Sequence, residues 1–209
     1  KFMERDMTFF IATKNRKKLA EMLRILKPLG ISAICEADLD KQLEEVEETG
    51  TTFAENAMLK AEAGCKATGL PAVADDSGLM VDCLGGAPGV YSKRYSGEDG
   101  NDERNIQKLL TALKDVPESE RTAHFVSSVC AVWPDGRMLQ AEGRCDGVIA
   151  QSPSGSGGFG YDPVFLYGGV SFAELSAEEK DAVSHRGKAL KAFKEKLEKF
   201  IKETENADK

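Results

Sequence analysis

The chain has 209 residues, 41% of them hydrophobic and 30% charged, and its formal net charge is −7 at pH 7. This length allows one sizeable α/β core or two small domains, and the composition is ordinary for a globular protein. The negative charge argues against a broad surface for DNA or RNA, because such surfaces neutralise phosphates with lysine and arginine. An acidic protein still binds a small anion where basic side chains converge.

The five cysteines, at positions 35, 65, 83, 130 and 145, are odd in number and show no C-x-x-C spacing. This pattern disfavours a zinc site and a disulfide framework, and it favours a reducing cytoplasm. The sequence has no apolar stretch long enough to cross a bilayer and no signal-peptide pattern. We therefore expect a cytoplasmic protein without a membrane partner. Residues 1–6 are expected to be disordered or an artificially added N-terminus.

The chain begins with a strand, a turn and a helix. Residues 8–12 predict a buried strand, and residues 17–26 carry apolar side chains at helical spacing. Between them, Thr13-Lys14-Asn15 turns the chain, and Lys18 follows in the first turn of the helix. Backbone N–H groups at such a junction point at an anion, so Asn15 and Lys18 are candidate phosphate contacts. The alternative is an ordinary helix start with a solvated basic first turn.

The next segment is acidic and leads into a capped helix. Residues 38–50 are rich in aspartate and glutamate, and Thr52 with Glu55 fits a capping box for a helix that ends near residues 68–69. Glu48 could complete a magnesium site, and Lys60 on that helix could contact phosphate. The alternative is a solvated acidic face and an exposed lysine.

Residues 74–79 read Ala-Asp-Asp-Ser-Gly-Leu and stand between two short apolar runs, which predicts a loop after a buried strand. The carboxylates of Asp75 and Asp76 are costly to desolvate, so they usually hold a metal, a proton or a polar ligand. With hard oxygen donors and no histidine cluster nearby, the expected ion is magnesium, which commonly accompanies phosphates. The alternative is a turn in which both aspartates face water.

The second half of the chain predicts a helix around residues 106–113, a long hairpin over residues 123–144, a flexible loop at 152–160, a strand at 164–166 and an amphipathic helix from residue 187. Residues 203–209 are expected to be a frayed polar tail. Phe159, flanked by glycines, either stacks on a nucleobase or is buried in the core. His185 and Arg186 either donate to oxygen acceptors of a base or are ordinary polar surface.

Taken together, these segments resemble the Ham1/RdgB family of inosine triphosphate pyrophosphatases, which act on non-canonical purine nucleoside triphosphates. The resemblance runs from Phe10 to about Leu190. Six motifs carry it in the family's order: Ala12-Thr13-x-Asn15-x-x-Lys18, residues 48–61 (Glu-Thr-Gly-x-x-Phe-x-Glu-Asn-Ala-x-x-Lys-Ala), residues 74–79, residues 84–92, residues 158–163 and Ser184-His185-Arg186-Gly187. The chain departs from the family at Lys14, where a glycine is usual.

The resemblance implies an α/β fold: a single domain over residues 7–202, two-lobed around a long mixed β-sheet with flanking helices, and an active-site cleft between the lobes. It implies Mg²⁺-dependent hydrolysis of ITP, dITP and XTP to the monophosphate and pyrophosphate. It also implies a homodimer that removes deaminated purines from the nucleotide pool, and the cytoplasmic location expected from the cysteines agrees with this role. Asp76 would be the catalytic carboxylate and a magnesium ligand with Glu48, although Asp75 remains an alternative for accepting the proton. The substrate contacts would come from Thr13, Lys14, Asn15, Lys18, Lys60, Ser77, Phe159, Gly160, Tyr161, Asp162, Lys180, His185 and Arg186, with Lys18 and Lys60 also catalytic.

Two other functions remain open on the sequence. A Maf-like pyrophosphatase acting on modified pyrimidine nucleotides could use a similar architecture, and a non-catalytic nucleotide sensor could use the same residues. The paired aspartates and Glu48 weigh against the sensor, because binding alone needs no carboxylate that activates water.

Overall fold

The computed structural model describes residues 8–207, with side chains to residue 203. The chain divides into two compact units. The first unit contains the chain up to Asp76, Ser127–Gly143 and the chain from Arg186 onward, and the second contains Ser77–Val126 and Arg144–His185. The single domain expected over residues 7–202 stays a prediction, as does the cleft between lobes, and residues 1–6 lie outside the described part.

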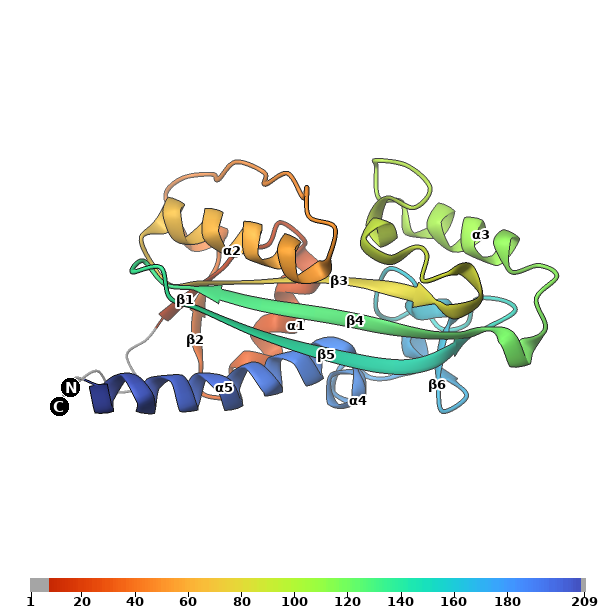
Figure 1. Ribbon diagram of the computed structural model, residues 1–209. Helices are drawn as coiled ribbons and strands as arrows, with labels where there is room; N and C mark the ends of the chain where they lie inside the picture. The colour runs from red at the N-terminus through yellow and green to blue at the C-terminus, as the bar shows by residue number, and fades with distance from the viewer. Residues whose placement is uncertain (1–7, 208–209) are drawn as a thin grey trace. The chain divides into compact units, whose positions relative to one another are not determined.

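Within residues 8–207, seven strands form one sheet in the order β2-β1-β3-β4-β5-β6-β7 (Figure 1). Strand β1 runs parallel to β2 and β3, whereas β5, β6 and β7 pair antiparallel, so the sheet is mixed as expected. The strands are β1 Thr8–Ile11, β2 Ser32–Ile34, β3 Ala72–Val81, β4 Thr122–Val132, β5 Met138–Ile149, β6 Phe165–Tyr167 and β7 Val170–Ser171.

Five α-helices accompany the sheet in the described chain: α1 Arg16–Leu26, α2 Phe53–Thr68, α3 Asp102–Ala112, α4 Ala177–Val183 and α5 His185–Ala207. The capping box predicted for α2 is confirmed, and the helix ends at Gly69 in the left-handed conformation. Helix α5 continues to Ala207, so residues 203–207 are helical where a frayed tail was expected. Among the described residues, every helix is too short or too polar to cross a bilayer.

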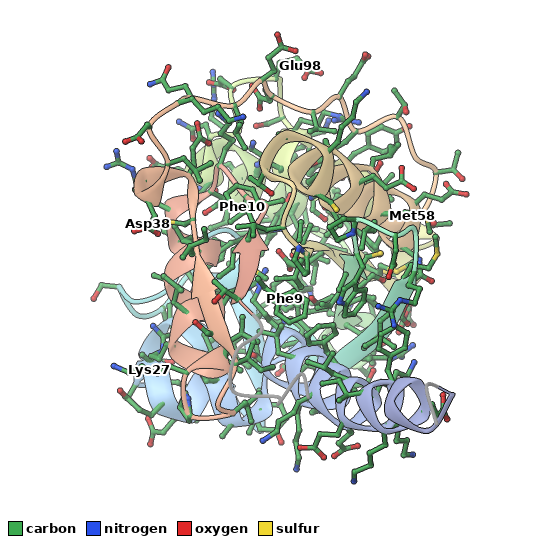
Figure 2. The ribbon with its side chains drawn as sticks, turned by 90° about the vertical axis from the view of Figure 1, so that its left-hand side faces the viewer. Phe9, Phe10, Lys27, Asp38, Met58 and Glu98 are labelled. Carbon is green, nitrogen blue, oxygen red and sulfur yellow. The ribbon has the colours of Figure 1, made fainter. Side chains whose placement is uncertain are left out.

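In the first unit, side chains alternate between the two faces of the sheet. Phe9 packs with α1 and α5 on one face, and Phe10 packs with α2 on the other (Figures 1 and 2). Val73 on β3 lies on the α1 and α5 face, and its neighbour Ala74 lies on the α2 face. This alternation is the geometric rule for a strand buried on both sides, and it explains the continuous apolar runs in the sequence.

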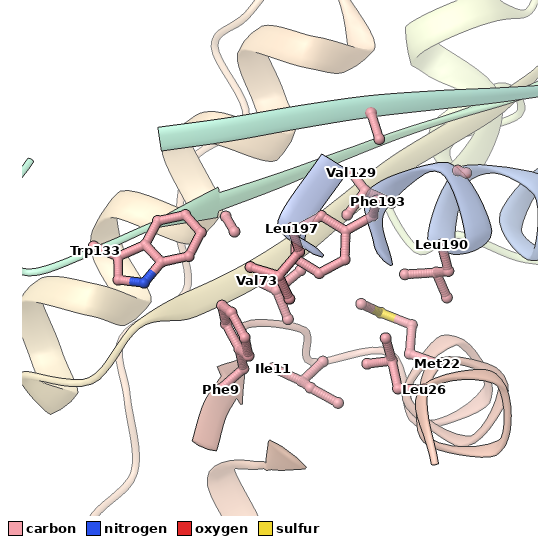
Figure 3. Packing of buried hydrophobic residues seen from close by; sticks show 13 residues of the cluster. Phe9, Ile11, Met22, Leu26, Val73, Val129, Trp133, Leu190, Phe193 and Leu197 are labelled. Atoms are coloured by element: carbon pink, nitrogen blue, oxygen red, sulfur yellow. The ribbon is translucent and has the colours of Figure 1, made fainter. Parts of the chain in front are cut away.

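Aromatic rings fill the core between the sheet, α1 and α5 (Figure 3). The ring of Phe9 meets those of Trp133 and Phe193 edge to face, with centroid distances of 5.6 Å and 5.9 Å. Aromatic pairs prefer this geometry, which fixes how α5 packs on β1. Met22 and Leu26 complete the contact from α1.

The second unit has a core of its own. Leu109 and Leu113 at the end of α3 pack against Leu79 on β3 and Phe165 on β6, within a cluster that also includes Phe172. The helix and the strands predicted for this part of the sequence are confirmed. Strand β5 extends to Ile149, five residues beyond the expected end of the hairpin.

The largest difference from the sequence prediction concerns residues 74–79. They lie in the middle of β3, a continuous strand over Ala72–Val81, and not in a loop. Both aspartates are buried in that strand. Polar residues in a strand interior are rare because desolvation must be offset, so their partners explain why the strand persists here.

We predict that Gly64→Ala destabilises the protein although alanine favours helices. A Cβ atom at this position of α2 would lie 2.8 Å from Ala12 Cβ and 3.0 Å from Phe10 Cδ1. Overpacking of this kind costs about 1–3 kcal/mol, which exceeds the helix-propensity gain of about 1 kcal/mol. Urea denaturation should show a lower free energy of unfolding. Lys66→Ala, at an exposed position of the same helix, is the control, and a stabilised Gly64→Ala protein would contradict the prediction.

Candidate active site

Asp75 and Asp76 are adjacent on β3, so their side chains point to opposite faces of the sheet. Asp75 contacts residues of α1 and α5, and Asp76 contacts residues of α2. Both carboxylates and all these partners belong to the first unit. The two aspartates therefore have separate chemical surroundings despite being neighbours in sequence.

Asp75 is held by two cations and a hydroxyl group. Its Oδ2 accepts hydrogen bonds from Arg186 Nε at 3.1 Å and from Ser127 Oγ at 3.2 Å. Arg186 Nη2 lies 3.0 Å from the same oxygen, and Lys18 Nζ lies 3.3 Å from Oδ1. With 1% of its surface exposed, Asp75 depends on these partners for its charge to persist.

Arg186 joins Asp75 to a third acidic residue. Its Nη1 donates to Glu21 on α1, and both side chains are almost fully buried. Two carboxylates and two cations, Lys18 and Arg186, thus balance one another in formal charge. Burial of Asp75 would raise its pKa, but the charges of Arg186 and Lys18 outweigh burial and hold that pKa well below its usual range.

Asp76 meets a different set of side chains on the α2 face. Lys60 Nζ lies 3.1 Å from Asp76 Oδ1 and 3.0 Å from Glu48 Oε1, so one ammonium group bridges the two carboxylates. Asn56 Nδ2 donates to Asp76 Oδ2 at 3.3 Å. Asn56 and Lys60 are four residues apart on α2, which places both on the same side of the helix.

The pKa of Asp76 moves in the opposite direction from that of Asp75. Burial raises the pKa of Asp76, Lys60 and Lys18 offset part of this effect, and the negative charge of Glu48 adds to it. Burial would lower the pKa of Lys60, but Asp76 and Glu48 raise it instead. Asp76 therefore has the character expected of a group that exchanges a proton, and Asp75 that of a permanently ionised structural group.

The carboxylates of Glu48 and Asp76 suit a magnesium ion. Both approach within 3.1 Å of one cationic point, Lys60 Nζ, and both offer hard oxygen donors. Among the described residues, no group of three or more His, Cys, Asp or Glu side chains could hold a metal. Magnesium is commonly bound by one or two carboxylates, with water and substrate phosphate as further ligands, so the donor set fits an ion shared with a phosphate group.

The segment that follows Glu48 is held against the start of α2. Gly50 N donates to Asn56 Oδ1 at 2.8 Å, and a Cβ atom on Gly50 would lie 2.6 Å from that oxygen. Thr51 N donates to Glu55 Oε2 at 2.6 Å, next to the capping box. Only glycine allows so close an approach, and this approach brings Glu48 to Lys60.

At the start of α1, Asn15 is the N-cap. Its side-chain oxygen accepts hydrogen bonds from the N–H groups of Lys17 and Lys18, each at 3.0 Å, and Thr13 Oγ1 accepts from Asn15 N at 3.2 Å. The sequence predicted that these N–H groups point at an anion. In the structure the Asn15 side chain satisfies two of them, and its amide nitrogen remains the donor suited to a phosphate.

Lys14, where the family usually has glycine, contacts the acidic segment. Its Nζ lies 2.9 Å from Glu36 Oε1 and donates to Leu43 O at 2.6 Å. The same Glu36 oxygen accepts from Leu43 N at 3.0 Å. The described contacts of Lys14 therefore attach the turn after β1 to the segment that leads to Glu48. Its part in substrate binding stays a prediction.

The residues expected to recognise a base lie in the second unit, except Arg186. Lys180 Nζ donates to Asp162 Oδ2 at 2.6 Å and lies 4.8 Å from the centroid of the Phe159 ring. The same Asp162 oxygen accepts from Phe159 N at 2.9 Å. Phe159 is only half-buried, so its ring is neither a core residue nor fully exposed. An ammonium group over its face is a favourable electrostatic contact.

Three other expected contacts belong to the second unit. His185 is buried and stacks on Phe125, with ring centroids 4.6 Å apart. Tyr161 is also buried, and its hydroxyl donates to Ser92 O at 2.8 Å. Ser77 is half-buried and follows Asp76 on β3.

The structure brings together most of the residues proposed for phosphate and metal. Lys18 contacts Asp75, and Lys60 contacts both Asp76 and Glu48. Arg186 was expected to face a base, but its guanidinium contacts Asp75 and Glu21 in the buried interior of the first unit.

Three polar residues that contact the site were not predicted from the sequence: Glu21, which binds Arg186, Asn56, which binds Asp76, and Ser127, which binds Asp75. Asn56 carried a signal, because it precedes Lys60 by one helical turn and lies within the second family motif. Glu21 carried a weaker one, because it is an acidic residue in a helix whose other charged residues are all basic. Ser127 carried none, because it contacts Asp75 from a strand 52 residues away.

Comparison with known proteins yields consistent matches over nearly the whole chain. Residues 9–196 match the profile of the Ham1 family. A dITP/XTP pyrophosphatase of Shigella flexneri is 50% identical over 191 residues, which cover 90% of this chain and 96% of that protein. A HAM1 protein of Coxiella burnetii superposes with a TM-score of 0.82 at 41% identity, covering 92% and 99% of the two chains. A nucleoside-triphosphatase, or dITP/XTP pyrophosphatase, of Mycobacterium abscessus superposes with a TM-score of 0.71 at 49% identity, covering 89% and 98%.

We predict opposite effects on stability for the two adjacent aspartates. Asp75→Asn should lower the free energy of unfolding by about 3–5 kcal/mol, because it leaves the buried Arg186 and the half-buried Lys18 with too little negative charge. Asp76→Asn should change it by less than about 1 kcal/mol, because burial disfavours the ionised carboxylate and Lys60 keeps Glu48 as a partner. Chemical denaturation at neutral pH measures both, and equal losses would contradict the assignment.

Proposed function

The chain belongs to the Ham1 family, and from this premise we propose that it hydrolyses the non-canonical purine nucleoside triphosphates ITP, dITP and XTP. The bond cleaved would be the one between the α and β phosphates, which yields a monophosphate and pyrophosphate. Relatives at about half sequence identity are dITP/XTP pyrophosphatases. The observation that carries the proposal is Lys60 between Glu48 and Asp76, because it gathers cationic and anionic groups suited to a metal-bound polyphosphate.

In the proposed mechanism, lysines hold the triphosphate. The ammonium groups of Lys18 and Lys60 would offset the charge that develops on phosphate oxygens as the bond breaks. Thr13 and Asn15, at the start of α1, would add hydrogen bonds from the hydroxyl and the amide. The helix N-terminus contributes a positive dipole end in the same place.

Asp76 is the proposed acceptor of the water proton, and Asp75 is not. A carboxylate whose pKa is raised by burial accepts a proton more readily than one held ionised by two cations. Asp75 instead keeps Lys18 in position through the contact at 3.3 Å. This division favours Asp76 over Asp75 as the proton acceptor, which is the alternative that the sequence left open.

Glu48 and Asp76 are the proposed magnesium ligands. Magnesium, when bound there, would polarise phosphate oxygens and stabilise charge on them. The residues of the chain supply the remaining requirements: Asn56 orients Asp76 through its amide, and Gly50 permits the approach of Glu48.

For base recognition we propose that Phe159 stacks on the purine, with Lys180 and His185 as donors toward the 6-position. Hypoxanthine and xanthine carry an acceptor oxygen there, whereas adenine carries a donor amino group. A site built from fixed donors would leave adenine with an unpaired polar group, which reduces its binding strongly. Arg186 would act indirectly, because its guanidinium already binds Asp75 and Glu21.

We also propose an oligomeric state, a biological role and a cellular location for the protein. The family resemblance implies a homodimer and a role in clearing deaminated purines from the nucleotide pool. The odd number and scattered spacing of the cysteines favour a cytoplasmic location.

Pyrophosphate release across a panel of triphosphates tests the activity. We expect kcat/KM for ITP, dITP and XTP to exceed that for ATP by about 100-fold or more, because a donor site mispairs with the amino group of adenine. Asp76→Asn should lower kcat by about 10²–10⁴-fold through loss of the proton acceptor. Preference for dTTP or dUTP would indicate a pyrimidine pyrophosphatase instead. Tight ITP binding without turnover would indicate a sensor.

Metal titration tests the proposed ligands. Chelation with EDTA should abolish pyrophosphate release, and added Mg²⁺ should restore it. Glu48→Gln should raise the Mg²⁺ concentration for half-maximal rate by about tenfold or more, because it removes a charged oxygen donor. Glu47→Gln is the matched control, since that side chain is exposed and carries the same charge. Equal metal requirements in both variants would refute the role of Glu48.

A further inference from the structure

The loop that carries Phe159 is attached to helix α3 by one carboxylate. Gly160 N donates to Asp102 Oδ2 at 2.8 Å, and the neighbouring Phe159 N donates to Asp162 Oδ2 at 2.9 Å. Two successive N–H groups of the loop are thus bound by two different carboxylates. Asp162 begins the short 3-10 helix directly after the loop, whereas Asp102 is 58 residues from Gly160 in sequence.

Without such contacts, the backbone of this loop would be free to change conformation. Gly158 and Gly160, on either side of Phe159, have φ angles of +67° and +61°, which glycine adopts easily but which it also leaves easily. A hydrogen bond to a carboxylate is stronger than one between neutral groups. The hydrogen bond from Gly160 N to Asp102 therefore restricts the backbone at Gly160, the residue that follows Phe159.

Asp102 is well placed to act as an anchor because its helix is itself held in place. It is the first residue of α3, after the N-cap Asn101. One turn later, the buried Asn105 accepts from Ser96 N at 2.7 Å and donates to Lys93 O at 2.9 Å. The helix is thereby fixed to residues 92–96, and the loop is fixed to the helix.

The same segment connects the loop to β3. Tyr161 Oη donates to Ser92 O at 2.8 Å, and Ser92 Oγ accepts from Leu79 N at 2.9 Å. Leu79 lies two residues after Ser77, a proposed substrate contact. All of these residues belong to the second unit. Hydrogen bonds thus link the Phe159 loop to β3 by two routes, one through Asp102 and α3 and the other through Tyr161.

We propose that Asp102 is a positioning residue for base selection, which fixes the backbone at Gly160 so that the Phe159 ring and Lys180 present one geometry to the purine. This inference rests on the proposed function. Asp102 itself contacts neither Lys180 nor Phe159 in the described hydrogen bonds, so its effect passes through the Gly160 backbone. The chemical class that it selects is a purine with an acceptor oxygen at position 6.

Steady-state kinetics with three variants tests this role. Asp102→Ala removes the acceptor, Asp102→Asn keeps an oxygen acceptor without charge, and Glu103→Ala removes the other acidic residue in the first turn of α3. Because both alanine variants lose one negative charge at the helix N-terminus, their effects on the helix dipole are matched.

We expect Asp102→Ala to lower the ratio of kcat/KM for ITP over ATP by about tenfold, mostly through a higher KM for ITP, with kcat changed less. Asp102→Asn should give an intermediate ratio, and Glu103→Ala should keep the wild-type ratio. An unchanged ratio in Asp102→Ala, or an equal fall in Glu103→Ala, would overturn the proposal.

Amide hydrogen exchange provides a readout that does not depend on turnover. Exchange in the peptide that contains residues 156–161 should become faster in Asp102→Ala than in the wild type or in Glu103→Ala. If Asp102→Ala does not fold, the same comparison is made with Asp102→Asn, whose weaker bond should give a smaller increase. Unaltered exchange in a folded Asp102 variant would overturn the proposal.

The wild-type measurement separates this inference from the proposed function. A wild-type protein that does not favour ITP over ATP refutes the proposed function. A wild-type protein that favours ITP, combined with an Asp102→Ala variant that favours it equally, refutes only the role of Asp102.

Discussion

Successive side chains of a β-strand point to opposite faces of a sheet, and β3 applies this rule to two adjacent aspartates. Asp75 faces the cations of α1 and α5, which hold it ionised, and Asp76 faces α2, where Lys60 and Asn56 meet it. The strand thus turns a repeated residue into two chemically different groups. In the proposed phosphate site, Lys18 is positioned by its contact with Asp75 and Lys60 by its contact with Asp76.

The division also separates stability from chemistry. The cluster around Asp75 is balanced in formal charge and mostly buried, so we expect the removal of one charged member to leave another without enough opposite charge. Asp76 is less favoured as an ion, because burial raises its pKa. Carboxyl groups with a raised pKa are typical of active sites, where residues needed for the reaction commonly lower the stability of the fold.

Local signals in the sequence predicted the α2 capping box and the strand–turn–helix at the start of the chain, because each depends on residues close together. The six motifs also contain Lys18, Glu48, Lys60 and Asp76, whose ion-pair contacts the structure shows and whose functional roles stay predictions. Other features depended on distant partners. The strand through residues 74–79 persists because Arg186, 111 residues from Asp75, neutralises a charge that local patterns assign to a loop. The buried position of Arg186 and the hydrogen bond from Ser127 to Asp75 likewise depend on residues that are far apart in the sequence.

The amide of Asn56 has a direction that no other side chain at this position could reproduce. Its oxygen accepts from Gly50 N and its nitrogen donates to Asp76, while the residue is 1% exposed. An aspartate of equal size would set two like charges against each other, and a leucine would leave a buried donor and acceptor unsatisfied. A carboxylate in place of this single amide would therefore put a second negative charge beside Asp76 and remove the hydrogen bond that Asp76 accepts from Asn56.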